Sequence, residues 1–174
     1  MSKRVITFGQ WDGKPIKWLV LKEDGFKTLV ISKCPLFSCR FNENRNDGNL
    51  WKTSSLRNYL NSTFWETAFS AEEKKKVVNC MLEHPDHTKD NVFVLSKEEA
   101  ENLLTQKERT FGNEFYDKCR SCAVNWYNNG YGVCSYLRSS YSSDTIYRVR
   151  PGGSIDYTSM NSFLCIHPAL YLKE

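Results

Sequence analysis

The sequence predicts a mixed α+β fold. Short apolar runs separated by turn residues fill the first 32 residues, helix-start patterns follow, and β-like alternation returns near the C-terminus. Of the 174 residues, 40% are hydrophobic, which is enough to bury a core. No linker divides the chain, so we expect one domain over residues 1–174, with a change of composition between residues 1–118 and residues 119–174.

The N-terminal segment predicts a three-stranded meander. Asp12 with Gly13, and then Asp24 with Gly25, supply the turn residues between consecutive strands. The expected strands lie at residues 5–8, 16–21 and 28–32.

Capping patterns predict the helices. Ser70 is followed three residues later by Glu73, and Ser96 by Glu99, which is the spacing of a capping box. We expect one helix over residues 54–60, a second from Ser70 and a third, after an apolar run at 91–95, from Ser96 to Leu104. The apolar face of the second helix would carry Val77, Val78, Met81 and Leu82.

The last segment, residues 165–172, predicts a strand. Because proline donates no ladder hydrogen bond, Pro168 indicates an edge position or a bulge there.

Residues 119–172 contain neither lysine nor glutamate, although both are frequent earlier. Between residues 125 and 163, Ser, Tyr, Asn, Gly and Asp make up more than half of the sequence. Apolar residues still recur there at the spacing of short strands, which argues against a disordered linker. We therefore expect strands with a polar, aromatic outer face.

This composition is typical of antibody-type binding surfaces, in which tyrosines supply rigid contact area and small polar residues adapt their hydrogen bonds. The alternative is a polar loop region that carries tyrosines incidentally, because turns also favour Ser, Asn and Gly. The candidate ligand-binding residues, with tyrosines and arginines as the expected anchors, are Tyr127, Asn128, Asn129, Tyr131, Tyr141, Ser142, Ser143, Asp144, Tyr147, Arg148, Arg150, Asp156, Tyr157, Ser159, Asn161 and Phe163.

The cysteines suggest a weaker alternative. Cys119 and Cys122 have the spacing of a redox pair or of half a zinc site, which Cys134 and Cys165 could complete. A zinc ribbon usually repeats the C-x-x-C pair, and this chain does not, so reduced, buried thiols are the preferred interpretation.

Other polar residues have ordinary structural interpretations. The run from His84 to Asp90 holds two histidines and two aspartates around Pro85, and a solvated turn is preferred there to a metal or acid/base site. Arg138 and His167 lie in apolar segments and are expected to be hydrogen-bonded structural groups. With only two carboxylates between residues 119 and 172, calcium binding is not expected, and neither a metal nor a cofactor is predicted.

Charge and hydropathy restrict the partners and the compartment. A net charge of +4, spread along the chain, predicts no nucleic-acid surface. No membrane-spanning run and no signal peptide are present, and seven cysteines are an odd number, which favours a reduced, cytoplasmic protein. The partner would be an unknown protein or another macromolecule, and nothing indicates an oligomeric state.

Several segments together resemble a bacterial and phage family of domains without an assigned function. Its members typically carry W-W-L-R-S-P-G, D-G-S-V and a terminal G-V-R-P-A-L-W-L, similar to residues 134–140, 152–155 and 165–172 here. Ser140 and Tyr141 replace the family's Pro and Gly, while Cys165 and His167 replace its terminal Gly and Arg. The upstream blocks that fit lie at residues 6–9, 16–21, 29–33, 51–60, 69–73 and 92–100.

The resemblance implies a C-type-lectin-like fold of the kind shared with formylglycine-generating enzymes. Its N- and C-terminal strands would pair, helices would flank them, and a long irregular region would present the ligand. The family is also similar to the variable proteins of diversity-generating retroelements, which diversify exposed C-terminal positions. Residues 1–118 would then be the scaffold half, and residues 119–174 the recognition half.

The resulting expectation is a non-enzymatic module that binds a ligand or protein target, whether diversified or serving one fixed partner, with phage association one possible setting. Two alternatives come from other classes. The first is an oxidase or metal enzyme of the formylglycine-generating type that uses Cys134 and Cys165. The second is a structural phage or assembly module that oligomerises through its tyrosine-rich face.

Overall fold

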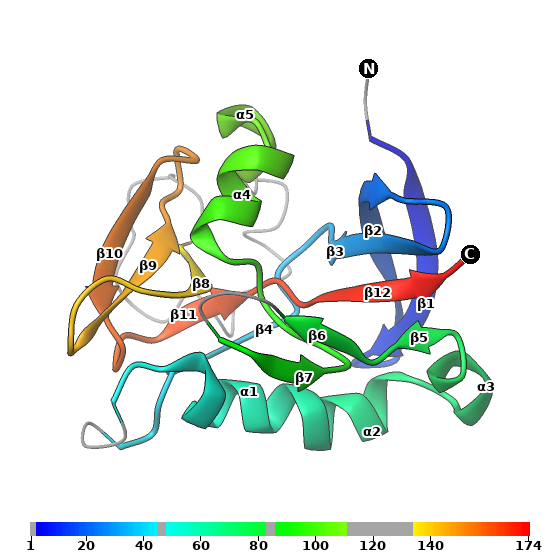
Figure 1. Ribbon diagram of the computed structural model, residues 1–174, viewed down its shortest axis with the longest axis horizontal. Coiled ribbons are helices and arrows are strands. Elements are labelled where there is room, and N and C mark those ends of the chain that lie inside the picture. Colours follow the sequence, from blue (N-terminus) through cyan, green and yellow to red (C-terminus); the bar gives the residue numbers. More distant parts are fainter. Residues whose placement is uncertain (1–2, 45–47, 83–85, 111–133) are drawn as a thin grey trace.

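The computed structural model describes residues 3–44, 48–82, 86–110 and 134–174. Within these residues, two five-stranded sheets and a two-stranded hairpin are joined by helices, which confirms a mixed α+β fold (Figure 1). No helix among the described residues has the length and apolar character needed to cross a membrane.

The first sheet joins the two ends of the chain. The predicted N-terminal meander is present, and the C-terminal strand adds to it antiparallel, with Leu170 opposite Val30. The expected pairing of N- and C-terminal strands is therefore confirmed. The strand order is β1 (Val5–Trp11), β2 (Lys14–Glu23), β3 (Lys27–Ser32), β12 (Ala169–Lys173) and β5 (Val77–Val78).

The second sheet carries most of the described tyrosine-rich region. Its strand order is β10 (Ile155–Ser159), β9 (Thr145–Val149), β8 (Ser135–Ser140), β11 (Leu164–Ile166) and β4 (Phe37–Cys39). The expected C-terminal strand is thus two strands, and Pro168 lies between them where the chain passes from one sheet to the other. Since β4 comes from the N-terminal half, both halves build this sheet.

The first predicted helix is longer than expected. Ser54 caps it, accepting a hydrogen bond from the Arg57 amide at 3.0 Å. Residues 55–68 then form one helical run with a π-helical turn in its middle, below β6 and β7 in Figure 1. Its parts are α1 (Ser55–Tyr59), η3 (Leu60–Phe64) and α2 (Trp65–Ala68), and a short 3-10 helix, η2 (Trp51–Thr53), precedes the cap.

Both predicted capping boxes are present, but the prediction of the second helix is wrong beyond the first turn of that helix. It ends at Lys74, and the residues assigned to its apolar face form β5 and β6 (Cys80–Leu82), with β6 paired to β7 (Thr88–Asp90). Val77 pairs with Leu172 of β12, so an available sheet edge and β-branched side chains outweigh the helical spacing. The remaining helices are α3 (Ala71–Lys74), α4 (Lys97–Leu103) and α5 (Gln106–Arg109).

One hydrophobic core underlies both sheets, and burial of its apolar surface is the main stabilising contribution to the fold. The largest fully buried side chains come from both sheets, the helical run and the segments between them, and include Trp51, Tyr136 and Phe41. Among them, Tyr136 packs on Phe41 with ring centroids 5.7 Å apart, and Phe41 packs on Trp51 at 6.2 Å. The β9–β10 hairpin, which follows β8, is therefore supported by packed core side chains.

Candidate functional site

The turn between β8 and β9 is held by a residue from the N-terminal half. Asn49, only 7% exposed, donates through Nδ2 to the carbonyls of Ser142 and Thr145, the latter at 2.9 Å. Its own carbonyl accepts a hydrogen bond from the Ser140 hydroxyl at 2.7 Å. These bonds satisfy backbone groups that a turn would otherwise leave to water, and they fix where Tyr141 projects.

Three of the predicted tyrosines form one cluster, Tyr141, Tyr147 and Tyr157, which we call the tyrosine cluster. The rings of Tyr141 and Tyr157 stack in parallel, with centroids 4.0 Å apart and 2° between their planes. Tyr147 meets Tyr141 edge to face at 5.4 Å and 85°. Although the rings pack on each other, Tyr141 and Tyr157 each remain 50% exposed. The cluster is thus a rigid aromatic surface open to solvent.

Three of the predicted charged residues, Arg148, Arg150 and Asp156, lie on the other face of the β9–β10 hairpin. Arg148 donates through Nε to Asp156 Oδ1 at 2.7 Å, and Arg150 Nη1 lies 3.6 Å from Asp156 Oδ2. Tyr147 and Arg148 are consecutive in β9, so their side chains point to opposite faces. Lys97 of α4 lies 5.5 Å from the Tyr147 ring, which places the tyrosine cluster on the α4 side.

The turn between β9 and β10 is docked on α5. Arg109 Nε donates to the Gly153 carbonyl at 2.8 Å, and Gln106 Nε2 donates to the Gly152 carbonyl at 3.1 Å. Gly153 has φ of +77°, and a Cβ there would collide with the Gln106 carbonyl. Both ends of the hairpin are therefore tied to the scaffold half.

The other predicted residues divide by exposure. Exposed side chains in the β8–β9 turn and near the end of β10 are Ser142, Ser143, Asp144, Ser159 and Phe163, while Asn161 is half-buried. Tyr127, Asn128, Asn129 and Tyr131 lie outside the described residues, as do Cys119 and Cys122.

Two residues of the scaffold half lie beside this surface and were missed. Leu50 is 60% exposed and follows Asn49, which is bonded to the β8–β9 turn. Lys97 borders the tyrosine cluster. No composition or spacing pattern identifies either residue, because the contacts that place them join segments about 50 to 90 residues apart.

Arg138 is the buried structural group that was expected. It donates to the Val94 carbonyl at 2.9 Å, to Asp86 at 2.8 Å and to both carboxylate oxygens of Glu99. Burial raises the pKa of Asp86 above its usual value, and Arg138 offsets this only in part. His167 is also buried, with Nδ1 3.1 Å from the Ser32 carbonyl oxygen.

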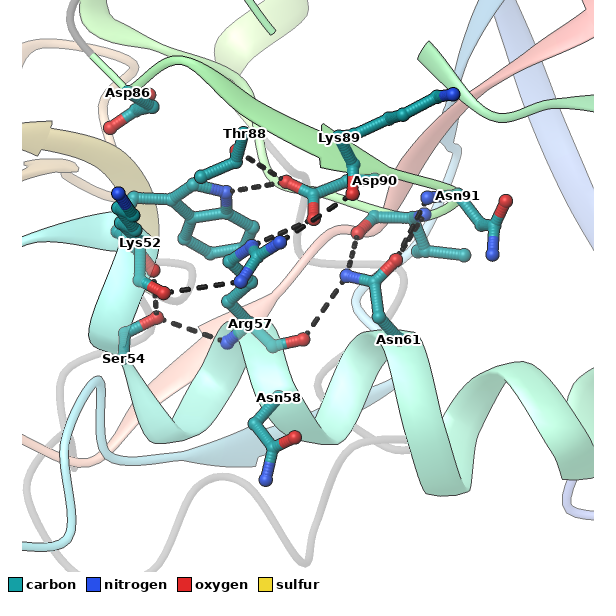
Figure 2. Close-up of polar contacts among 12 residues, drawn as sticks. Lys52, Ser54, Arg57, Asn58, Asn61, Asp86, Thr88, Lys89, Asp90 and Asn91 are labelled. Carbon is teal, nitrogen blue, oxygen red and sulfur yellow. Dashed lines mark hydrogen bonds and ion pairs between the residues drawn. The ribbon is translucent and has the colours of Figure 1, made fainter. Parts of the chain in front are cut away.

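The two described aspartates of the predicted His/Asp cluster serve different partners. Asp90 is buried and accepts hydrogen bonds from Trp51 Nε1 at 2.9 Å, Arg57 Nε at 2.7 Å and Thr88 Oγ1 at 2.7 Å (Figure 2). Asp86 is instead bonded to Arg138. The contacts of Asp90 join the helical run to the β6–β7 hairpin, so its role is structural. Among the described residues, no group of three His, Cys, Asp or Glu side chains is placed to hold a metal ion.

Cys165 lies in β11, and Cys134 immediately precedes the neighbouring strand β8, so the two are close, as the enzyme alternative requires, with the Cys165 amide donating to the Cys134 carbonyl at 3.0 Å. The residue directly opposite Cys165, however, is Ser135, so the side chain of Cys134 points to the other face of the sheet. Burial also raises the pKa of the Cys134 thiol, which disfavours the reactive thiolate.

Comparisons with known proteins give one match. A search of curated proteins and a search of solved structures each found no match. A family model described as a domain of unknown function (DUF6273) matches residues 17–174, which is most of the chain and leaves out only β1 and the first residues of β2 among the strands. The chain therefore belongs to the DUF6273 family of domains of unknown function.

Proposed function

We propose that this protein is a recognition module that binds a protein or another macromolecular target through the β8–β9 turn and the β9–β10 hairpin. The observation that carries the proposal is the tyrosine cluster: three interlocked rings, two of them half exposed, on a hairpin tied at both ends. A rigid aromatic surface loses little conformational entropy on binding, which is why tyrosine dominates antibody-type interfaces.

The finer form of the proposal is a C-type-lectin-like domain that acts as the variable protein of a diversity-generating retroelement. Exposed turn residues such as Ser142, Ser143 and Asp144, on a fixed backbone, support it, because they can vary without disturbing the core. The encoding locus tests this form. A reverse-transcriptase gene beside a near-copy of codons 125–167 that differs only at adenines is expected, and a locus without such a copy would leave a binder with one fixed partner.

Cross-linking in the native host tests the binding surface directly. A photoreactive phenylalanine analogue replaces Tyr157 in one protein and Phe26 in another. Phe26, 86% exposed, lies beside β3 in the other sheet and serves as the control. We expect a discrete cross-linked product from position 157 alone.

The cross-linked partner is then purified, and its affinity for the protein is measured. Replacing Tyr141 and Tyr147 with alanine should weaken binding at least about tenfold, as expected for aromatic anchors at an interface. Equal cross-linking from position 26, or unchanged affinity in a folded double variant, would contradict the proposal.

The buried Cys134 thiol and its register with Cys165 favour the binding module over an oxidase that pairs these two cysteines. A test is to replace Cys134 with serine in protein purified without chelator. Unchanged copper and zinc content, with unchanged target binding, is expected, and loss of a stoichiometric metal would favour the enzyme.

A further inference from the structure

The candidate residues lie on two faces of one hairpin, and this restricts the shape of the partner. Tyr147 and Tyr157 point toward α4, whereas Arg148 and Asp156 point to the opposite face. A partner that covers one face reaches only one of these groups. A strand laid beside β10 reaches both, because its side chains alternate between the two faces.

Strand β10 has the geometry to accept such a partner. The Arg150 amide donates to the Ser154 carbonyl at 2.8 Å, and the Met160 amide to the Asp144 carbonyl at 3.4 Å. In an antiparallel ladder, every second residue of a strand hydrogen-bonds to the neighbouring strand. Because Ser154 and Met160 are bonded positions, Asp156 and Thr158 between them also bond to β9. The N–H and C=O groups of Ile155 and Tyr157 are therefore directed away from β9.

This outer edge is the end of its sheet among the residues the structure describes, and β10 is the outermost labelled strand there in Figure 1. Proteins usually protect such edges with lysine, proline or a bulge. Residues 155–159 contain neither lysine nor proline, and their pairing with β9 is regular. The one charged residue, Asp156, is neutralised by its ion pair with Arg148.

We propose that the partner binds as an extended peptide segment that adds a strand to the outer edge of β10. This rests on the proposed function and names its partner class. Main-chain hydrogen bonds to Ile155 and Tyr157 would supply affinity, and an apolar side chain of the peptide would pack on the tyrosine cluster. An adjacent acidic residue would face Arg150, which is 55% exposed and only loosely paired with Asp156 at 3.6 Å.

A phage-displayed library of random twelve-residue peptides, selected on the full chain, tests the inference. The most enriched peptide is synthesised, and its affinity is measured for Tyr157→Ala and Tyr157→Pro. Both variants lack the ring, but only proline lacks the outward N–H group. We expect enriched peptides to pair an acidic residue with an aromatic or aliphatic neighbour. Affinity should fall about tenfold further for proline than for alanine, the effect of one lost hydrogen bond.

Hydrogen exchange on wild-type protein provides a measurement that does not depend on the proline variant folding. Bound peptide should slow exchange at the amides of Ile155 and Tyr157. Equal affinities in two folded variants, unchanged exchange, or a selection without enrichment would each overturn the edge-strand inference. By contrast, a peptide that slows this exchange yet ignores alanine at Tyr141 and Tyr147 would contradict the proposed function of the tyrosine cluster.

Discussion

Replacing Arg138 should cause a large loss of stability, because its guanidinium neutralises the carboxylates of Asp86 and Glu99. Replacing it with methionine keeps volume but leaves two carboxylates without their cation. We expect the free energy of unfolding to fall by about 3 to 5 kcal/mol. Urea denaturation measures it, with Arg150→Gln as the exposed control, expected to change stability by no more than about 0.5 kcal/mol. Equal effects of the two changes would contradict the buried ion pair.

The same variant should have a changed pH dependence. Burial raises the pKa of Asp86, and Arg138 partly opposes this, so removing Arg138 raises that pKa further. The folded variant then binds a proton that the unfolded chain releases, and its stability increases as pH falls from 7 toward 5. The difference in urea midpoint between the variant and the wild type should therefore be smaller at pH 5 than at pH 7. A constant difference would show that Asp86 stays ionised.

Asp90 should be nearly as sensitive, because three donors converge on its buried carboxylate. In Asp90→Asn one oxygen becomes an NH2 group, which cannot accept a hydrogen bond from Trp51 or Arg57. We expect a loss of about 2 to 4 kcal/mol in the free energy of unfolding. Asn58→Asp is a nearby exposed control on α1. An Asp90→Asn variant as stable as this control would contradict the network in Figure 2.

At the scale of elements, Gly153 and Gly152 form a matched pair in the turn that docks on α5. Gly153→Ala requires positive φ from alanine and forces its Cβ against the Gln106 carbonyl, whereas a Cβ on Gly152 meets open space. We expect Gly153→Ala to cost about 2 kcal/mol or more, and Gly152→Ala less than about 0.5 kcal/mol. Hydrogen exchange in β9 and β10 should accelerate in the first variant alone. Similar effects would mean that this docking does not hold the hairpin.

Elements with local causes were predictable. The capping residues Ser70 and Ser96, and the Asp12-Gly13 turn, act within a few residues of themselves, so short-range chemistry identified the helix starts and the meander. Val77 was misassigned because its partner, Leu172, lies at the other end of the chain. Tyr141 and Tyr157 were recognised as candidates, but their stacking depends on the bulged β8–β9 pairing, which no local pattern encodes.

At the scale of the whole molecule, the compositional boundary near residue 119 is not a structural boundary. Strand β11 pairs with β4, and β12 lies between β3 and β5, so the C-terminal strands complete both sheets. The strand pairing follows from where apolar faces can be covered, and so it can cross a change in the composition of the exposed residues. Exposed residues of the second half can thus change while the sheets beneath them keep their register.

This interleaving predicts that residues 134–174 cannot fold alone. A fragment of residues 134–174 keeps the β8–β9–β10 hairpins but loses β3 and β5 on both sides of β12, β4 beside β11, and the Asn49 bonds that hold the β8–β9 turn. Its unpaired strand edges and exposed apolar faces leave too little buried surface to offset the entropy of ordering the chain. We expect no cooperative thermal transition by circular dichroism and no dispersed amide resonances, whereas the full chain should show both. A cooperatively folding fragment would mean that the second sheet carries its own core and that the tyrosine cluster is supported without the scaffold half.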